Sequence, residues 1–203
     1  MLTLLYSGNL GIGQDIATVL RALAQLNGTV DLRMLIVGGG KGLPPVRKLA
    51  SQLQLSQVEF RKPVPLYKLP GLLAEGDIHV ICQKPGTEGL LVPSKIYSTL
   101  LAGRPTLFVG PPNCEAARIV CDSQSGIVVE PGDIERTRHA LMTLVHSMTT
   151  REEMGFNARA YYETLFGRER SISRLVGILE TVGNGNNSQH KRWRRANTAK
   201  SGL

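Results

Sequence analysis

The chain has 203 residues, a hydrophobic fraction of 42% and a formal net charge of +8 at pH 7. This length is enough for one domain, or one domain with a small addition, and for a sizeable core. No apolar run approaches the roughly 18 residues that span a bilayer, so the sequence excludes a membrane-spanning helix.

The cysteines and the N-terminus indicate a cytoplasmic protein. Cys82, Cys114 and Cys121 form an odd set without a close CxxC pair, which predicts reduced thiols rather than a disulfide frame or a zinc site. Met1 leads directly into a strand-like run, so we expect no signal peptide.

Short apolar runs alternate with amphipathic stretches over the first 149 residues. Strands are predicted at residues 2–6, 32–37, 58–60, 77–82, 106–109 and 126–129. Helices are predicted at residues 16–26, from Pro44 onward, and at 66–74, 93–102 and 115–121. Continuous apolar strands separated by helices are typical of a parallel sheet covered on both faces. The predicted fold is therefore a doubly wound, Rossmann-like α/β domain with about six strands and a helical C-terminal extension.

The C-terminal part is predicted to be helical and then disordered. Helices are expected at residues 134–148, 151–165 and 171–181. We assign residues 1–149 to the Rossmann-like domain, 150–182 to C-terminal helices of the same domain and 183–203 to a disordered tail. This tail has five cations, no acid and few apolar residues to offset ordering entropy. An anionic membrane surface, nucleic acid or no partner at all are open interpretations of the tail.

Residues 88–105 carry the most informative pattern of the chain. Pro93 can begin a helix because a proline in the first turn loses no hydrogen bond, and Gly103 ends the apolar repeat. The free N–H groups of a helix start favour a phosphate, and Lys95 adds a full positive charge there. A diphosphate site and an ordinary surface helix both fit this stretch.

Several polar and glycine-rich loops follow the predicted strands. Ligands of open parallel sheets bind beyond the carboxyl ends of the strands, which gathers loops 7–13, 38–42, 61–65, 83–95 and 110–113. Lys41, Lys62 and Lys84 lie in three of these loops. Loop 7–13 matches neither the GxGxxG dinucleotide fingerprint nor a P-loop, so its glycines also fit a simple tight turn.

Taken together, these stretches resemble the C-terminal, nucleotide-sugar-binding half of the retaining GT-B fold glycosyltransferases that build bacterial polysaccharides. The resemblance covers nearly all of residues 1–182. Its most specific parts are the Pro-Ser-Lys stretch at 93–97 and the Ala-Gly-Arg-Pro stretch at 102–105. They are typical of a branch whose members often make capsule and exopolysaccharide.

The resemblance implies transfer of a sugar from a nucleotide diphosphate sugar, favouring UDP, to a glycan or lipid-linked acceptor. It implies no metal or other cofactor, since fixed charges can stabilise the departing diphosphate. The implied catalytic residues are Lys95, at the leaving group, and Glu88, at the sugar. The residues implied to bind the nucleotide sugar are Gly8, Asn9, Gly11, Gly39, Arg61, Lys62, Gly89, Ser94, Lys95 and Ser98.

The sequence also departs from the family pattern. The family usually has Arg where this chain has Asn9, Lys where it has Gln14, and an acid where it has Ser98. Lys41, Arg61 or Lys84 are candidates to replace the lost charge. The acceptor half expected of a GT-B enzyme is absent, so we expect a split enzyme with a partner subunit, a fragment, or a protein inactive alone. A non-catalytic nucleotide-sugar-binding module and, less favoured, nucleic-acid binding through the tail are the alternatives.

Overall fold

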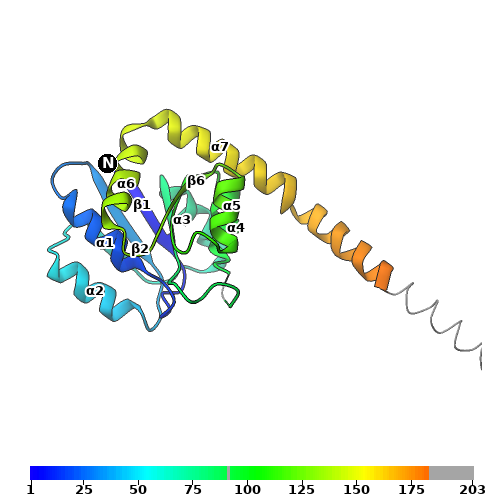
Figure 1. Ribbon diagram of the computed structural model, residues 1–203, viewed down its shortest axis with the longest axis horizontal. Helices are drawn as coiled ribbons and strands as arrows, with labels where there is room; N and C mark the ends of the chain where they lie inside the picture. The colour runs from blue at the N-terminus through cyan, green and yellow to red at the C-terminus, as the bar shows by residue number, and fades with distance from the viewer. Residues whose placement is uncertain (91, 183–203) are drawn as a thin grey trace, which may run out of the picture. The chain divides into compact units, whose positions relative to one another are not determined.

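The computed structural model describes residues 1–90 and 92–182 (Figure 1). Residues Met1–Tyr162 form one compact unit, and a second unit begins at Glu163. Residues 150–162 of the predicted C-terminal helices lie in the first unit. The disorder predicted for residues 183–203 lies outside the described residues.

In the described part of the chain, six strands form one parallel sheet with the order β3-β2-β1-β4-β5-β6. The strands are β1 (Leu2–Ser7), β2 (Leu32–Val37), β3 (Val58–Arg61), β4 (Ile78–Cys82), β5 (Thr106–Val109) and β6 (Gly126–Val129). The predicted fold class and strand count are confirmed. β1 and β4 are neighbours although two strands separate them in sequence. The strand order therefore reverses at this point: β2 and β3 are added on one side of β1, and β4 to β6 on the other.

Helices cover both faces of this sheet. They are α1 (Ile16–Gln25), α2 (Leu43–Gln52), η1 (Leu66–Lys68), α3 (Leu69–Glu75), α4 (Lys95–Ala102), α5 (Glu115–Asp122), α6 (Ile134–His146) and α7 (Met148–Leu165). Figure 1 shows α1, α2 and α6 on one side of the sheet and α4 and α5 on the other. A larger apolar core lies under α1 and α6, and a smaller one lies between β1, β2 and α3.

The predicted helices 134–148 and 151–165 are observed as α6 and α7 with ends shifted by two or three residues. Two other predicted helices differ in their bounds for local reasons. The predicted helix 66–74 is a 3-10 turn followed by α3, because Pro70 lies in the first turn of α3, where a proline starts a helix rather than continuing one. The central helix α4 begins at Lys95 rather than Pro93, with Ser94 as its N-cap. Gly103 ends α4 in the left-handed conformation that glycine adopts easily.

None of the helices formed by residues 1–90 and 92–182 combines the length and apolar character needed to cross a bilayer. In the second unit, residues 168–182 are helical, which includes the predicted helix 171–181.

His79 is a buried histidine of β4 with both ring nitrogens satisfied. Its Nε2 lies 3.0 Å from the carbonyl oxygen of Leu73, and its Nδ1 lies 3.2 Å from the hydroxyl of Thr99. The carbonyl can only accept, so Nε2 carries the proton and Nδ1 accepts from Thr99. Burial, with a smaller contribution from the Arg104 cation, lowers the pKa of His79 to about 4. His79 is therefore a packed core histidine.

Because His79 is buried as the neutral form, we expect the folded protein to lose stability at acidic pH. As the pH falls below 6.5, the histidine of the unfolded chain gains a proton before the folded one does. Stability is therefore fully present above pH 6.5 and is lost as the pH falls toward 4, by on the order of 3 kcal/mol. Urea unfolding at a series of pH values measures this loss. In His79→Gln the slope between pH 6.5 and 4 should be smaller than in the wild type; an unchanged slope would contradict the assignment.

Candidate functional site

A cavity of about 560 Å³ opens at the carboxyl ends of β1, β2 and β3. It is lined by Ser7, Gly8, Asn9, Val37, Gly38, Gly39, Pro63, Val64, Leu69, Leu72, Ser94, Lys95 and Ser98. We call it the edge cavity. It lies at the edge of the sheet where the sequence predicted a ligand, beside the point where the strand order reverses.

The start of α4 supplies unused hydrogen-bond donors to this cavity. The amides of Ile96 and Tyr97 already donate to the carbonyls of Pro93 and Ser94. Within residues 1–90 and 92–182, the amides of Ser94 and Lys95 and the Ser94 hydroxyl make no hydrogen bond. These groups lie at the positive end of a helix, where a phosphate is stabilised.

Lys95 points from this helix start toward the end of β1. Its Nζ lies 3.4 Å from the carbonyl oxygen of Asn9 and 5.0 Å from the centre of the Tyr6 ring. The buried Tyr6 hydroxyl donates to the same carbonyl at 2.9 Å. Burial lowers the pKa of Lys95, so the ammonium gains more from a facing anion than a fully hydrated lysine would. The cation therefore lies where a diphosphate at the α4 start would need it.

The loops after β1 and β2 are locked together by backbone contacts. The Gly8 amide donates to Val37 O at 2.8 Å, and the Leu10 amide donates to Gly39 O at 2.7 Å. Two amides of the stretch 8–11, which contains three of the residues implied to bind the nucleotide sugar, are thus used within the protein. Among the described residues the amides of Asn9 and Gly11 donate to nothing, and Asn9 is the one of the two that lines the edge cavity.

Ser98, which the resemblance implied to bind the nucleotide sugar, lines the edge cavity one turn into α4. Its hydroxyl donates to the Lys95 carbonyl at 2.8 Å. The oxygen still has a lone pair to accept a hydrogen bond, but its proton is already used. Ser98 is therefore a weaker substitute for the family's carboxylate than the sequence alone indicated.

Six of the predicted site residues come together at the edge cavity and five do not. The six are Gly8, Asn9, Gly39, Ser94, Lys95 and Ser98. The five that lie outside its lining are Gly11, Arg61, Lys62, Glu88 and Gly89. Glu88 and Gly89 lie on the exposed loop between β4 and α4, so the sugar-facing role implied for them stays a prediction.

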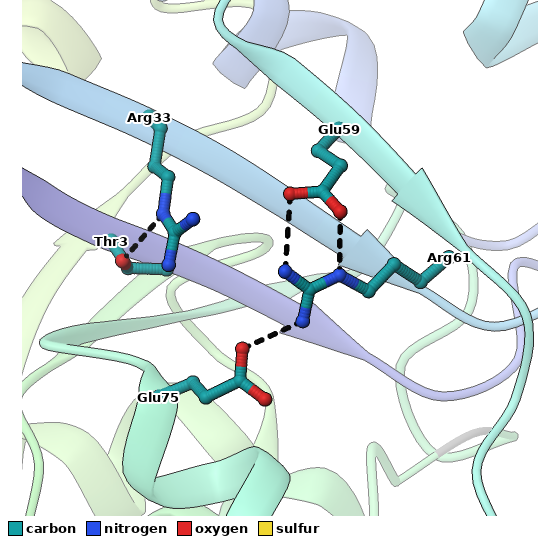
Figure 2. A network of polar contacts seen from close by, with 5 residues as sticks. All are labelled: Thr3, Arg33, Glu59, Arg61 and Glu75. Atoms are coloured by element: carbon teal, nitrogen blue, oxygen red, sulfur yellow. Dashed lines mark hydrogen bonds and ion pairs between the residues drawn. The ribbon is translucent and has the colours of Figure 1, made fainter.

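Arg61 is held by two carboxylates rather than by the cavity (Figure 2). Its guanidinium bonds both oxygens of Glu59, at 2.6 and 3.1 Å, and one oxygen of Glu75 at 2.6 Å. The hydrogen bond from Arg61 lowers the pKa of Glu59, which keeps this carboxylate charged. Arg61 is therefore already paired, and it is a poor replacement for the Arg missing at position 9.

Sequence reasoning missed the apolar wall of the edge cavity. Leu69 and Leu72 reach it from α3, beside Val64 from the loop that follows β3. Leucines at helical spacing indicate a buried face but do not distinguish a core from a ligand wall. This wall suits the flat apolar surface of a nucleobase.

The relatives of the chain identify its family. The sequence pattern described as "Glycosyl transferases group 1" matches residues 2–161. The chain belongs to the group 1 glycosyl transferases. It is 32% identical over 182 residues to the putative colanic acid biosynthesis glycosyl transferase WcaI of Escherichia coli K12, a match that covers 87% of this chain and 42% of WcaI.

Solved glycosyl transferases share its fold. Anabaena HepE, solved in complex with UDP-glucose, superposes with a TM-score of 0.74 at 18% identity, over 89% of this chain and 48% of HepE. The C-terminal domain of the group 1 family protein LpcC from Francisella tularensis superposes with a TM-score of 0.68 at 16% identity, over 82% of this chain and 87% of that domain. The expected fold, the C-terminal half of a GT-B glycosyltransferase, is confirmed. The chain spans between 32% and 42% of the length of the curated relatives it matches.

The interlocked glycine loops predict a difference between neighbouring glycines. Gly38 has a φ of +154°, and a Cβ there would collide with the carbonyl oxygen of Gly8. Gly39 has open space within 4 Å. Gly38→Ala should lower the free energy of unfolding by at least about 2 kcal/mol, because it strains the backbone and separates the loops. Gly39→Ala, the matched control, should change it by less than about 1 kcal/mol. Equal stabilities in urea unfolding would show that the loops are not locked as described.

Proposed function

We propose that the chain is the donor-binding half of a glycosyltransferase, which takes a sugar from a nucleotide diphosphate sugar and passes it to a glycan or lipid-linked acceptor. The observation that carries this proposal is the edge cavity with its two chemically different sides. One side has the free amides of the α4 start and the Lys95 ammonium, and the other is apolar. A nucleoside diphosphate has the same division between charged phosphates and an apolar base.

The charged side fits the leaving group of the reaction. When the bond between the anomeric carbon and the β-phosphate oxygen breaks, negative charge grows on the diphosphate. Lys95 and the α4 start are fixed in position before the reaction, so they stabilise this charge without reorganising. On this basis we propose that transfer proceeds without a metal ion. UDP is the favoured nucleotide, because HepE, which shares the fold, was solved with UDP-glucose.

Further partners follow from the length and charge of the chain. A group 1 glycosyl transferase that spans about two fifths of its relatives needs an acceptor-binding half, in the same or another polypeptide. We propose a cytoplasmic enzyme at the inner face of the cell membrane, with residues 183–203 and their +5 charge contacting anionic lipid. Nucleic acid is the less favoured partner for these residues.

A non-catalytic nucleotide-sugar-binding module is the second candidate. Asn9, Gln14 and Ser98 are neutral where the family has charge, and Ser98 has its proton committed. Both candidates require donor binding, and only the first requires transfer.

Replacing the cation tests donor binding. Lys95→Ala should weaken UDP binding by about 1.5–3 kcal/mol, because a charged hydrogen bond to phosphate is lost. Isothermal titration calorimetry with UDP and GDP measures the effect. Lys68→Ala, which removes an exposed lysine outside the edge cavity, is the control and should bind UDP as the wild type does. Equal affinities of the Lys95 and Lys68 variants would remove Lys95 from the site.

Separating binding from transfer distinguishes the two candidates. The purified chain should bind a UDP-sugar but transfer no sugar until an acceptor-binding half is added. Radiolabelled sugar transfer, with and without that half, measures this. Fast transfer by the chain alone would refute the half-enzyme proposal, and no transfer with any acceptor half would favour the non-catalytic module.

A further inference from the structure

A second cavity of about 410 Å³ lies between the starts of α1 and α2. It shares no lining residue with the edge cavity. The loop after β1 separates the two, because Ser7, Gly8 and Asn9 line the edge cavity whereas the stretch from Leu10 to Ile12 lines the second one. Gly11, which sequence reasoning assigned to the donor, therefore belongs to this other cavity.

Three cations from separate parts of the chain border the second cavity. They are Arg21 of α1, Lys41 before α2 and Lys84 after β4. The Lys84 amide donates to Gly13 O at 2.8 Å, which ties that residue to the cavity loop. Over residues 1–90 and 92–182, none of the three side chains forms a hydrogen bond or an ion pair. Asp15 also lines the cavity, so its three cations and one acid leave a net formal charge of +2. This positive lining favours an anion, and lysine and arginine are the residues that bind phosphate groups.

The acid and the amide in the lining leave this preference in place. The Asp15 carboxylate already accepts a hydrogen bond from the Thr18 hydroxyl. The buried Oε1 of Gln14 has no hydrogen-bond partner among the described residues. A buried acceptor without a donor is costly, so this wall is incompletely satisfied in the free chain.

Aliphatic side chains form the rest of the cavity. Leu10, Val46 and Leu49 line it, and Ile12 at its rim is 71% exposed. An isoleucine this exposed gains free energy when an apolar group covers it. Inorganic phosphate would use the cations but leave Ile12 in water.

We propose that the second cavity binds a phosphate group carried on an aliphatic chain. The phosphate lies among Arg21, Lys41 and Lys84, and the chain covers Ile12 and the neighbouring aliphatic residues. Two sources share this chemistry, a phospholipid headgroup in a bilayer and a single prenyl phosphate. The site is separate from the proposed donor cavity, so either can be present without the other.

Calorimetry on the full chain tests the proposal with farnesyl phosphate, inorganic phosphate and farnesol as probes. Farnesyl phosphate should bind at one site and at least about tenfold more tightly than either of the others, because it uses both the cations and the apolar wall. Lys41→Gln/Lys84→Gln should weaken it at least about tenfold. Ile12→Ser should weaken farnesyl phosphate but not inorganic phosphate.

Matched controls separate the site from general charge and from the donor cavity. Lys48→Gln/Lys68→Gln removes the same charge from exposed lysines outside both cavities, and Lys95→Ala alters only the edge cavity. Both should bind farnesyl phosphate like the wild type. Equal losses in the two double variants, or loss in Lys95→Ala, would overturn the proposal. Circular dichroism confirms that each variant is folded.

Flotation with phosphatidylglycerol and phosphatidylcholine vesicles identifies the source. Residues 183–203 are the same in both double variants, so phosphatidylglycerol binding that is weaker in Lys41→Gln/Lys84→Gln than in the control assigns the site to lipid headgroups. Binding of farnesyl phosphate, with phosphatidylglycerol binding that is equal in the two double variants, assigns it to a single prenyl phosphate. Binding of neither ligand would overturn the proposal.

Discussion

The reversal of strand order between β1 and β4 is the constraint on which the site depends. Because all strands are parallel, the loops after β1, β2 and β3 and the loop that leads into α4 meet at one edge of the sheet. The contact between Lys95 Nζ and the Asn9 carbonyl joins residues 86 positions apart in the sequence. The edge cavity is therefore a consequence of topology, and the residues at its rim decide what it binds.

The site concentrates its positive charge at one point. With Asn9 and Gln14 neutral and Arg61 paired with two carboxylates, Lys95 is the cation that lines the edge cavity in the described part of the chain. Burying an ammonium is costly, and two groups offset this cost, the Asn9 carbonyl and the electron-rich face of Tyr6. Tyr6 also fixes the Asn9 carbonyl through its hydroxyl. A single buried tyrosine thus positions both the cation and the turn beside it.

Periodicity and turn residues were enough to predict the sheet, most helix bounds and the position of Lys95. These features are local, since apolar runs, prolines and glycines act on their own segment. The ion pairs of Arg61 could be predicted only in part from the sequence. Glu59 lies two residues away on the same strand face, which is a sequence signal, but Glu75 approaches from α3 through the fold.

The backbone contacts between the loops after β1 and β2 could not be predicted from the sequence, for a different reason. Glycines in two neighbouring loops indicate close approach, but they do not say whether the partner is a ligand or the other loop. Here Gly38 packs against Gly8, so the glycines serve the loop contact and the amides of Gly8 and Leu10 serve it too. The apolar wall from Leu69 and Leu72 was likewise hidden, because a ligand wall and a core face have the same helical spacing.

The central claim is that the start of α4 receives the diphosphate of a nucleotide sugar. A two-dimensional NMR titration of the ¹⁵N-labelled chain with UDP tests it most directly, because it reports each amide separately. The amides of Asn9, Ser94 and Lys95 should shift together and saturate at one equivalent, while amides at the opposite end of the sheet, such as that of Arg104, stay in place. Saturable binding that leaves the Ser94 and Lys95 amides unshifted would contradict the claim.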